Sequence, residues 1–395
     1  FLSKSNVDIL LLNLRKPSIS NVNDVKIVKK FGIKIINYKN FLNESDKDDI
    51  KNSEKQIIEK LNSLFVSEEL DNEFQIDGRN FGLIIKDHLK EIFSKRFTEA
   101  VKYYEAIDKI FKEVNVGSIL ALNDVGFEEK IILSLSNTHN ISGHILQHGI
   151  FTDSEYLEKF RNIIPIFPKF GFKAAVWGKV LKKYLVDKGI SEQEISVIGS
   201  PRHDQFFQKE RNEINDVLIC STPQSSIDCD SIDSHAYDEA YSMIQEMIKT
   251  INEEKYSVIV KEHPSQGDPL DVTSAIRDID ESIRFYKNQD VLQLIKKSRI
   301  VICIGFSTVL LEAMMLGKPT ILYQIHPNWI KNDGIVSNAT NIVKTKEEFK
   351  KMLMRLMTDE QFKILQIEKG NDFVERYLEN QGNASRILKD ELVRI

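Results

Sequence analysis

The chain has 395 residues, of which 42% are hydrophobic and 29% charged, and its formal net charge is −5 at pH 7. This length suits two domains, and the acidic balance provides no chain-wide positive field for nucleic acid. Cys220, Cys229 and Cys303 lack metal-ligand spacing and are typical of free thiols in a reducing cytosol. No apolar run approaches a membrane span and no signal-peptide pattern opens the sequence, so we expect a cytoplasmic protein.

In the first half of the chain, short apolar runs alternate with longer helical patterns. Runs rich in Ile and Val predict strands at 7–13, 33–38, 117–124, 142–149 and 174–178. Apolar residues at helical spacing predict helices over 85–114, 127–135 and 179–189. Strands that alternate with helices are typical of a parallel α/β sheet.

The same alternation continues in the second half. A new cycle opens with "ISVIGSPRHD" at 195–204 and a polar linker at 208–216, which places the boundary between two α/β domains near residues 190–215. Apolar runs then predict strands within 217–220, 256–264, 299–305 and 320–324. Helical patterns cover 235–254, 290–297, 307–316 and the charged tail 359–395.

Polar residues follow abruptly where many of these apolar runs end. Because open parallel sheets bind ligands at the carboxyl ends of their strands, we expect these residues to line a cleft. In the first half they are Asn123, Asp124, Gln147, His148 and Gly149. In the second half they are Ser200, Arg202, Ser221, Thr222, Gln224, Lys261, His263, Ser307 and Thr308.

The start of the helix at 307–316 has the chemistry of an anion site. Ser307 and Thr308 open this helix directly after Gly305, so their hydroxyls and the first free N–H groups can coordinate an anion. Glu312 lies one turn after Thr308, where a carboxylate can accept hydrogen bonds from a ribose diol. With the donors described next, the second half of the chain alone could therefore hold a phosphate, a sugar and a base.

Further donors come from the other strand ends. His263, Lys261 and Arg202 are suited to phosphate oxygens. Pro264 fixes the backbone directly after His263, so the imidazole projects from a rigid point. Together with the helix start, these residues predict a nucleotide site.

Taken singly, the same residues have ordinary structural explanations. The hydroxyls at 307–308 could be helix caps, and His263 could belong to a turn. His148 could be a half-buried histidine, and Glu312 could face solvent. Only the joint pattern favours a nucleotide site.

Other motifs carry less information. "DCD" at 228–230 matches the Asp-x-Asp of metal-dependent sugar transferases, but it lies in a Ser-rich stretch past its strand, and a solvated loop is favoured. His144 and His148 alternate along one strand without a third ligand, so we expect no metal site. No dinucleotide, P-loop or nucleophile-elbow fingerprint follows any strand.

Several motifs resemble, in the same order, those of GT-B-type glycosyltransferases of bacterial surface polysaccharide synthesis. They are "ILQHGIF", "ISVIGSPRHDQF", "VKEHP" and "IGFSTVLLEAMMLGKPTILY". The subgroup with a His-Pro and a Ser/Thr-Ser-like motif includes polysialyltransferases, capsule Kdo transferases and CDP-glycerol glycerophosphotransferases. The resemblance covers about residues 115–325, and this chain has Ser-Thr where some relatives have Ser-Ser.

The resemblance implies two Rossmann-like parallel-sheet domains that face a central cleft. An acceptor domain would cover 1–193 and a nucleotide-sugar-binding domain 194–375, with a C-terminal helix at 376–395 that crosses back to the first domain. By position, His263 would bind the donor phosphate together with the helix start at 307–308. Glu312 would bind the donor ribose, and the cleft would be lined by Gln147, His148 and Gly149.

The implied reaction is a single inverting displacement without metal or cofactor. A base deprotonates an acceptor hydroxyl, which attacks the anomeric carbon as the nucleoside phosphate leaves. Asp124 is the predicted base, with His148 and Glu128 as alternatives. The favoured donor is a CMP-activated acidic sugar such as Kdo or a sialic-acid-like sugar. The acceptor would be a glycan or lipid-linked glycan of capsule polysaccharide or lipopolysaccharide.

Three other functions remain open. A CDP-glycerol or CDP-ribitol transferase would use the same phosphate ligands but attack phosphorus. A hydrolysing UDP-GlcNAc 2-epimerase shares the two-domain fold and needs no acceptor. A non-catalytic glycan- or nucleotide-binding module would bind without transfer.

The basic helix at 179–189 has two interpretations, a contact with membrane lipid or a solvated surface. Its lysines could rest on anionic lipid at the inner face of the cell membrane, where a lipid-linked acceptor would lie. A solvated helix face explains the same charges equally well.

Overall fold

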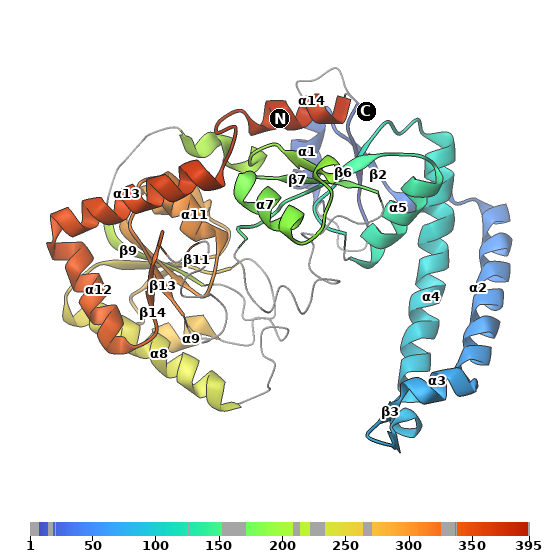
Figure 1. Cartoon of the computed structure of the whole chain (residues 1–395), viewed down its shortest axis with the longest axis horizontal. Helices are drawn as coiled ribbons and strands as arrows, with labels where there is room; N and C mark the ends of the chain where they lie inside the picture. Colours follow the sequence, from blue (N-terminus) through green and yellow to red (C-terminus); the bar gives the residue numbers. More distant parts are fainter. Residues whose placement is uncertain are drawn as a thin grey trace. The chain divides into compact units, whose positions relative to one another are not determined.

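A computed structural model describes residues 8–14, 19, 21–124, 126–151, 171–207, 214–221, 234–263, 271–324, 336 and 338–393 (Figure 1). The described residues form two compact units. Unit 1 draws on Phe1–Leu146, Pro168–Ala174 and Lys389–Ile395, and unit 2 on Gln147–Phe167 and Ala175–Leu388. The boundaries expected from the sequence after residues 193 and 375 stay predictions.

Unit 2 contains a six-stranded parallel sheet with the order β11-β10-β9-β12-β13-β14. Counted along the chain, this order is third, second, first, fourth, fifth, sixth, which is the order of a Rossmann fold. The strands are β9 (Asn215–Ser221), β10 (Val258–Lys261), β11 (Arg284–Tyr286), β12 (Ser298–Ile304), β13 (Thr320–Tyr323) and β14 (Asn341–Val343). The expected strands at 217–220, 256–264, 299–305 and 320–324 are confirmed, whereas β11 and β14 were not expected.

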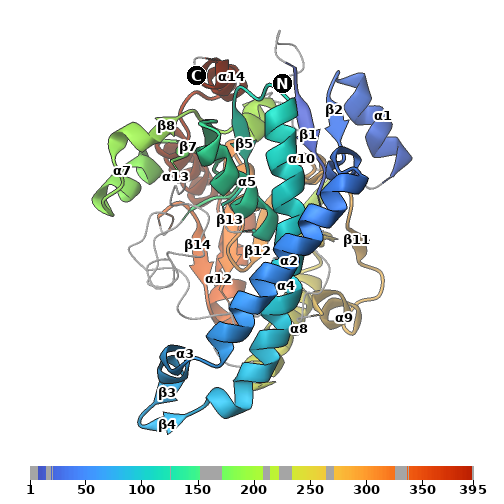
Figure 2. The ribbon, with the colours of Figure 1, turned by 90° about the vertical axis from the view of Figure 1, so that its right-hand side faces the viewer.

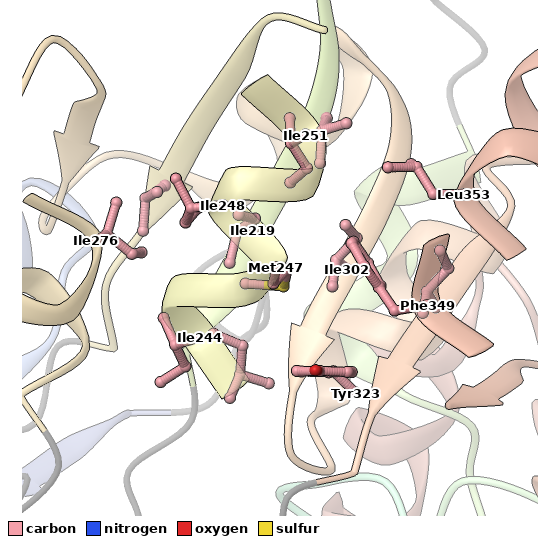
Figure 3. Packing of buried hydrophobic residues seen from close by; sticks show 14 of the residues in the cluster. Ile219, Ile244, Met247, Ile248, Ile251, Ile276, Ile302, Tyr323, Phe349 and Leu353 are labelled. Atoms are coloured by element: carbon pink, nitrogen blue, oxygen red, sulfur yellow. The ribbon is translucent and has the colours of Figure 1, made fainter. Parts of the chain in front are cut away.

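The core of unit 2 explains why its strands are continuous apolar runs. Alternate residues such as Ile300 and Ile302 of β12 belong to one large buried cluster, while Val301 between them is also fully buried. A strand buried on both faces needs apolar residues at every position. Figure 3 shows Ile302 and Tyr323 of the sheet among the side chains of two helices, including Met247 and Phe349.

Helices flank the sheet of unit 2. The cluster takes residues from α8 (Ser234–Glu253), α9 (Val272–Arg277) and α12 (Lys346–Thr358). Helices α10 (Val291–Lys296) and α11 (Thr308–Met315) also contact β12 but contribute no residue to that cluster. Helix α13 (Glu360–Tyr377) packs on both α11 and α7 (Lys179–Asp187). The helices expected at 235–254, 290–297, 307–316 and 179–189 are confirmed; α9 and α12 were not expected.

The remaining elements near residue 200 are short. They are the 3₁₀ turns η3 (Glu192–Glu194) and η4 (Pro201–Phe207) and strand β8 (Ile195–Val197). Strand β7 (Lys173–Val176) and helix α14 (Ala384–Val393) have residues in both units. Both carboxylate oxygens of Asp204 accept backbone N–H groups at the start of α14, from Ala384 and Ser385. The expected helical tail therefore consists of α13 and α14.

Unit 1 begins with two strands that pair in parallel, β1 (Leu10–Leu12) and β2 (Lys34–Ile36). Its other short elements are α1 (Val22–Lys30), η2 (Tyr38–Phe41), β5 (Ile119–Ala121), α5 (Phe127–Thr138) and β6 (Gly143–Leu146). Strands β5 and β6 pair in parallel. A side chain at Gly143 is impossible without movement, because its Cβ would lie 2.1 Å from the carbonyl oxygen of Ile119.

Two long helices of unit 1 run side by side, α2 (Glu44–Phe65) and α4 (Gly82–Glu113) (Figure 2). Helix α3 (Glu68–Glu73) and the antiparallel hairpin of β3 (Gln75–Ile76) and β4 (Arg79–Asn80) lie between them in the chain. We call 44–113 the helical hairpin. The helix expected over 85–114 is confirmed as α4, whereas α2 was not expected. No helix in the described part of the chain is long and apolar enough to cross a membrane.

Candidate functional site

The strand order of unit 2 defines a topological switch point between β9 and β12. From β9 the chain builds the sheet in one direction, and from β12 in the other. The two strands are paired in parallel up to Ser221 and Ile304, so their carboxyl ends lie next to each other. Open α/β sheets bind ligands at such a point, and several candidate residues follow these two strands and β10.

His263 is tied to the end of β9. Its backbone N–H donates to the hydroxyl of Ser221 at 3.1 Å, so two of the candidate residues are in contact. Burial lowers the pKa of His263, and the nearby charge of Lys261 lowers it further. The imidazole is therefore neutral near pH 7. The predicted ligands Thr222 and Pro264, and the "DCD" motif, lie outside the described residues.

The chain leaves β12 through a left-handed glycine and enters α11 through a cap. Gly305 has φ of 81°, a conformation that favours glycine. Ser307 is the N-cap of α11, and its hydroxyl accepts the N–H of Val309 at 3.3 Å. Thr308 is the first helical residue, and its hydroxyl accepts the N–H of Ile150 at 3.1 Å. The hydroxyls thus serve as local caps and contacts, and the helix start remains the feature suited to an anion.

The segment Gln147–Phe151 packs on the start of α11. A Cβ added to Gly149 would lie 3.4 Å from the hydroxyl of Thr308. Gln147 is buried; its amide oxygen accepts the backbone N–H of Trp177 at 2.8 Å, and its amide nitrogen donates to the carbonyl of Gly149 at 2.9 Å. His148 is exposed. Gly149 and Thr308, two of the residues expected to line a cleft, therefore lie close together within unit 2.

The hydroxyl of Tyr377 completes the anchoring of this segment. Tyr377 is fully buried; it accepts the backbone N–H of Phe151 and the amide nitrogen of Gln147, and donates to the carbonyl of Phe151 at 3.3 Å. Tyr377 is the last residue of α13. Gly178 allows this end of α13 to approach closely, because a Cβ at position 178 would lie 2.2 Å from the carbonyl oxygen of Tyr377. The end of α13 thus holds the segment that touches Thr308.

Glu312 does not face solvent. It is 1% exposed, and its Oε1 lies 2.9 Å from Nη2 of Arg202 and 3.2 Å from Nε2 of His203. Arg202 also reaches the carbonyl of His148 with Nη1, at 3.4 Å. The simplest structural explanation of Glu312, an exposed helix residue, is excluded. Arg202, which we expected on a phosphate, pairs with this carboxylate.

Lys261 occupies the end of β10 but donates to the backbone. Its Nζ lies 2.6 Å from the carbonyl oxygen of Glu262 and 2.9 Å from that of Lys287. Burial lowers the pKa of Lys261, and the interactions with Cys220 and Glu262 offset that effect only in part. Its role as a phosphate ligand stays a prediction.

The predicted base belongs to unit 1. Asp124 follows β5 and is fully buried, and Glu128 lies in the first turn of α5 with 8% exposure. The side-chain oxygen of Asn123 accepts the N–H of Gly126 at 2.9 Å, which closes the turn into α5. The catalytic roles of Asp124, Glu128 and His148 stay predictions.

His144 lies in the core of unit 1. It is fully buried, with Nε2 3.9 Å from a carboxylate oxygen of Glu391, and burial lowers its pKa. Among the residues that the structure describes, no group of three or more His, Cys, Asp or Glu side chains could hold a metal ion.

Sequence reasoning missed three side chains around the candidate site. His203 directly follows Arg202 in the motif "SPRHD" and was not singled out, and neither Trp177 nor Tyr377 was. All three are buried, and their hydrogen-bond partners, Glu312, Gln147 and Phe151 respectively, lie far away in the chain. The one local sign of the role of His203 was its position directly after Arg202, a predicted phosphate ligand.

These features define a mixed α/β protein of the GT-B fold class, which glycosyltransferases and nucleotide-sugar epimerases share. The UDP-GlcNAc 2-epimerase of Neisseria meningitidis bound to UDP-GlcNAc is similar with a TM-score of 0.52 and 12% identity, over 76% of this chain and 82% of that one. HepE of Anabaena in complex with UDP-glucose is similar with a TM-score of 0.51 and 10% identity, over 98% of this chain and 100% of that one. A glycosyltransferase of Rickettsia africae has a TM-score of 0.50 and 12% identity, over 98% and 90%.

The family is defined more closely by sequence. The model of the LIC12162 family of transferases matches residues 5–333, and the chain belongs to this family. The search of curated proteins found no match.

Proposed function

We propose that this transferase moves a sugar from a nucleotide-activated donor to a hydroxyl of a surface glycan. The observation that carries the proposal is the switch point of unit 2, where His263 contacts Ser221 beside the glycine turn into α11. Membership of a transferase family supports group transfer, and the fold it shares with nucleotide-sugar enzymes supports the donor class.

In the proposed complex, the donor phosphate lies at the start of α11. The neutral imidazole of His263 donates one hydrogen bond to it, and the first N–H groups of the helix add the favourable end of the helix dipole. Glu312 accepts from the ribose hydroxyls. Lys261 and Arg202 are further cations near these strand ends and would oppose the charge of the leaving group.

The proposed reaction is an inverting displacement that needs no metal. The acceptor oxygen forms a bond to the anomeric carbon while the bond from that carbon to the phosphate oxygen breaks. The proton of the acceptor hydroxyl passes to Asp124, with His148 and Glu128 as the alternatives, and the nucleotide leaves with the bonding electrons. Replacement of Asp124 by Asn should then abolish transfer without loss of nucleotide binding.

The favoured donor is a CMP-activated acidic sugar of the Kdo or sialic-acid type, used in capsule or lipopolysaccharide synthesis at the inner face of the membrane. This choice rests on the His-Pro and Ser-Thr motifs. Two of the similar structures contain UDP-sugars instead, so a UDP-sugar is the principal competing donor.

A thermal-shift panel of CMP, CDP, UDP and GDP tests the proposal. We expect a cytidine nucleotide to raise the melting temperature of the wild type, and His263→Ala to weaken that binding at least about tenfold, because a hydrogen bond to a charged group is lost. His88→Ala, at an exposed histidine of α4, is the matched control and should bind normally. Stabilisation by UDP alone would replace the cytidine donor, and stabilisation by no nucleotide would refute the proposal.

One further function has a specific observation in its favour, the similarity of the fold to UDP-GlcNAc 2-epimerases. Turnover of UDP-GlcNAc without any acceptor would identify that activity. With a cytidine donor, a new glycoside supports sugar transfer, whereas a new phosphodiester identifies a polyol-phosphate transferase. Full activity in EDTA is expected for the metal-independent reaction.

A further inference from the structure

The two oxygens of the Glu312 carboxylate have different surroundings. Oε1 accepts hydrogen bonds from Nη2 of Arg202 at 2.9 Å and from Nε2 of His203 at 3.2 Å. Oε2 is buried and has no hydrogen-bond partner within the described part of the chain. A buried carboxylate oxygen without a partner is costly, so the asymmetry needs an explanation.

His203 is held rigidly against this carboxylate. Its ring is fully buried between Trp177 and Phe206, with edge-to-face contacts at centroid distances of 5.1 Å and 5.2 Å. Burial lowers the pKa of His203 despite the opposing effect of Glu312, which favours the neutral ring near pH 7. Because a carboxylate can only accept, the neutral ring must carry its hydrogen on Nε2.

The two donors differ in how firmly they hold Glu312. The side chain of Arg202 is 53% exposed, so water and ligands can compete for its guanidinium. His203 is inaccessible and cannot be displaced by solvent. If Arg202 turns toward a phosphate, His203 still orients the carboxylate.

The position of Glu312 in the fold indicates which kind of ligand its Oε2 can bind. It lies on α11 one turn after Thr308, next to the switch point, and its charge is among the causes that raise the pKa of the buried Cys303 thiol at the end of β12. A carboxylate oxygen at that position with no hydrogen-bond partner among the described residues is suited to hydroxyl donors. The hydroxyls of a ribose are such donors.

We propose that His203 is a positioning residue that fixes Oε1 of Glu312, so that Oε2 accepts from the ribose of the nucleotide donor and the site selects ribonucleotides. This inference rests on the proposed function, since it assigns a residue to the same site. His203 touches no substrate. Its effect is confined to the sugar of the nucleotide, and phosphate binding by His263 and the helix start is independent of it.

The test compares the dissociation constants of CDP and UDP with those of their 2′,3′-dideoxy forms. For the wild type we expect the ribonucleotide to bind about tenfold more tightly or better, and Glu312→Gln to remove most of that preference. His203→Phe keeps the ring packing but cannot donate, and should reduce the preference by between about twofold and tenfold. His203→Gln, which can donate again, should recover part of it. Binding of the dideoxy nucleotides should change little in each variant.

A destabilised but unrelated variant separates positioning from folding. Phe349→Leu changes the core under α12 and should lower the melting temperature without changing the ratio of the two affinities. A wild-type preference that survives in His203→Phe, or a wild type that binds both nucleotide forms equally, would overturn the inference and leave the proposed function standing. Binding of neither form would overturn both.

Discussion

The six-stranded sheet of unit 2 and the helical hairpin of unit 1 are stabilised in different ways. The central strands of the sheet are buried on both faces, and their partners come from segments far apart in the chain. Helix α2 of the hairpin has only Ile50, Leu61 and Phe65 buried, and starts with a capping box of Asn43 and Asp46. Apolar burial dominates the first region, whereas the second buries few side chains of α2 and starts that helix with a capping box.

The hairpin also leaves large apolar side chains exposed. The side chains of Val66 and Ile84 are 79% and 77% exposed, whereas no large apolar side chain in the six strands of the sheet is exposed. Aromatic contacts of Phe93 with Phe65 and Phe97 cover part of the helix pair. Long regular helices therefore form here with few buried side chains, whereas the central strands of the sheet are buried on both faces.

The largest effect is expected from a cavity in the sheet. Ile302→Ala should reduce the free energy of unfolding by between about 2 and 5 kcal/mol, because Ile302 is fully buried among the side chains of the core cluster. Ile302→Val is the matched control and should cost between about 0.5 and 1.5 kcal/mol. Leu64→Ala in the hairpin, where the side chain is 47% exposed, should cost about 1 kcal/mol or less. Denaturant unfolding measures all three, and equal costs would contradict the comparison.

The next largest loss of stability is expected at Gly143 of unit 1, which lies very close to the backbone of Ile119. Gly143→Ala would place a Cβ 2.1 Å from the carbonyl oxygen of Ile119 and 2.5 Å from the ring of Phe172, and should cost between about 1 and 3 kcal/mol. Gly117→Ala is the control, since no atom lies within 4 Å of its Cβ. Thermal unfolding of both variants checks this; a Gly143→Ala protein as stable as the control would show that β5 and β6 can separate without cost.

The smallest effect concerns an ion pair on the helix layer of unit 2. Hydrogen bonds from Lys249 and Lys346 lower the pKa of Glu246 to about 2, from an ordinary value of 4.5. Since the folded pKa is the lower one, the contribution is present above about pH 4.5 and is lost as the pH falls towards 2. Lys346→Ala should therefore cost at most about 1 kcal/mol at neutral pH, and less in high salt.

The control for this pair is another lysine of the same helix. Lys351 is exposed, and its replacement by Ala should leave the pH dependence of unfolding below pH 5 as in the wild type. If both lysine variants reduce the pH dependence of the unfolding free energy below pH 5 equally, the effect comes from total charge, and the pair with Glu246 has no special role.

Local patterns predicted much of unit 2. Apolar runs bounded by polar residues identified β9, β10, β12 and β13, and helical spacing identified α8 and α11. Strands β11 and β14 have three residues each, too few for a periodic signal. Helix α2 was missed because its 22 residues contain few apolar ones, so its stability depends on Asn43, on Asp46 and on contact with α4.

The candidate site was predicted in part. Placing ligands at the ends of strands selected His263, Ser221 and the turn at 305–308, which the parallel pairing brings together. The same rule gave Arg202, and helical spacing from Thr308 gave Glu312, but neither predicted the contact between the two residues. His203 was passed over. A buried histidine is distinguished from an ordinary core residue only by its neighbours, and these come from other parts of the chain.

The sequence by itself determined the class of fold, because strand and helix patterns depend on the spacing of apolar residues along a few turns. It also determined which residues end the strands. Only the tertiary structure decided that Ile150 meets Thr308 across 158 residues of chain, and that His203 shares Glu312 with Arg202. Such contacts depend on strand order and on packing between distant segments, and no local pattern encodes them.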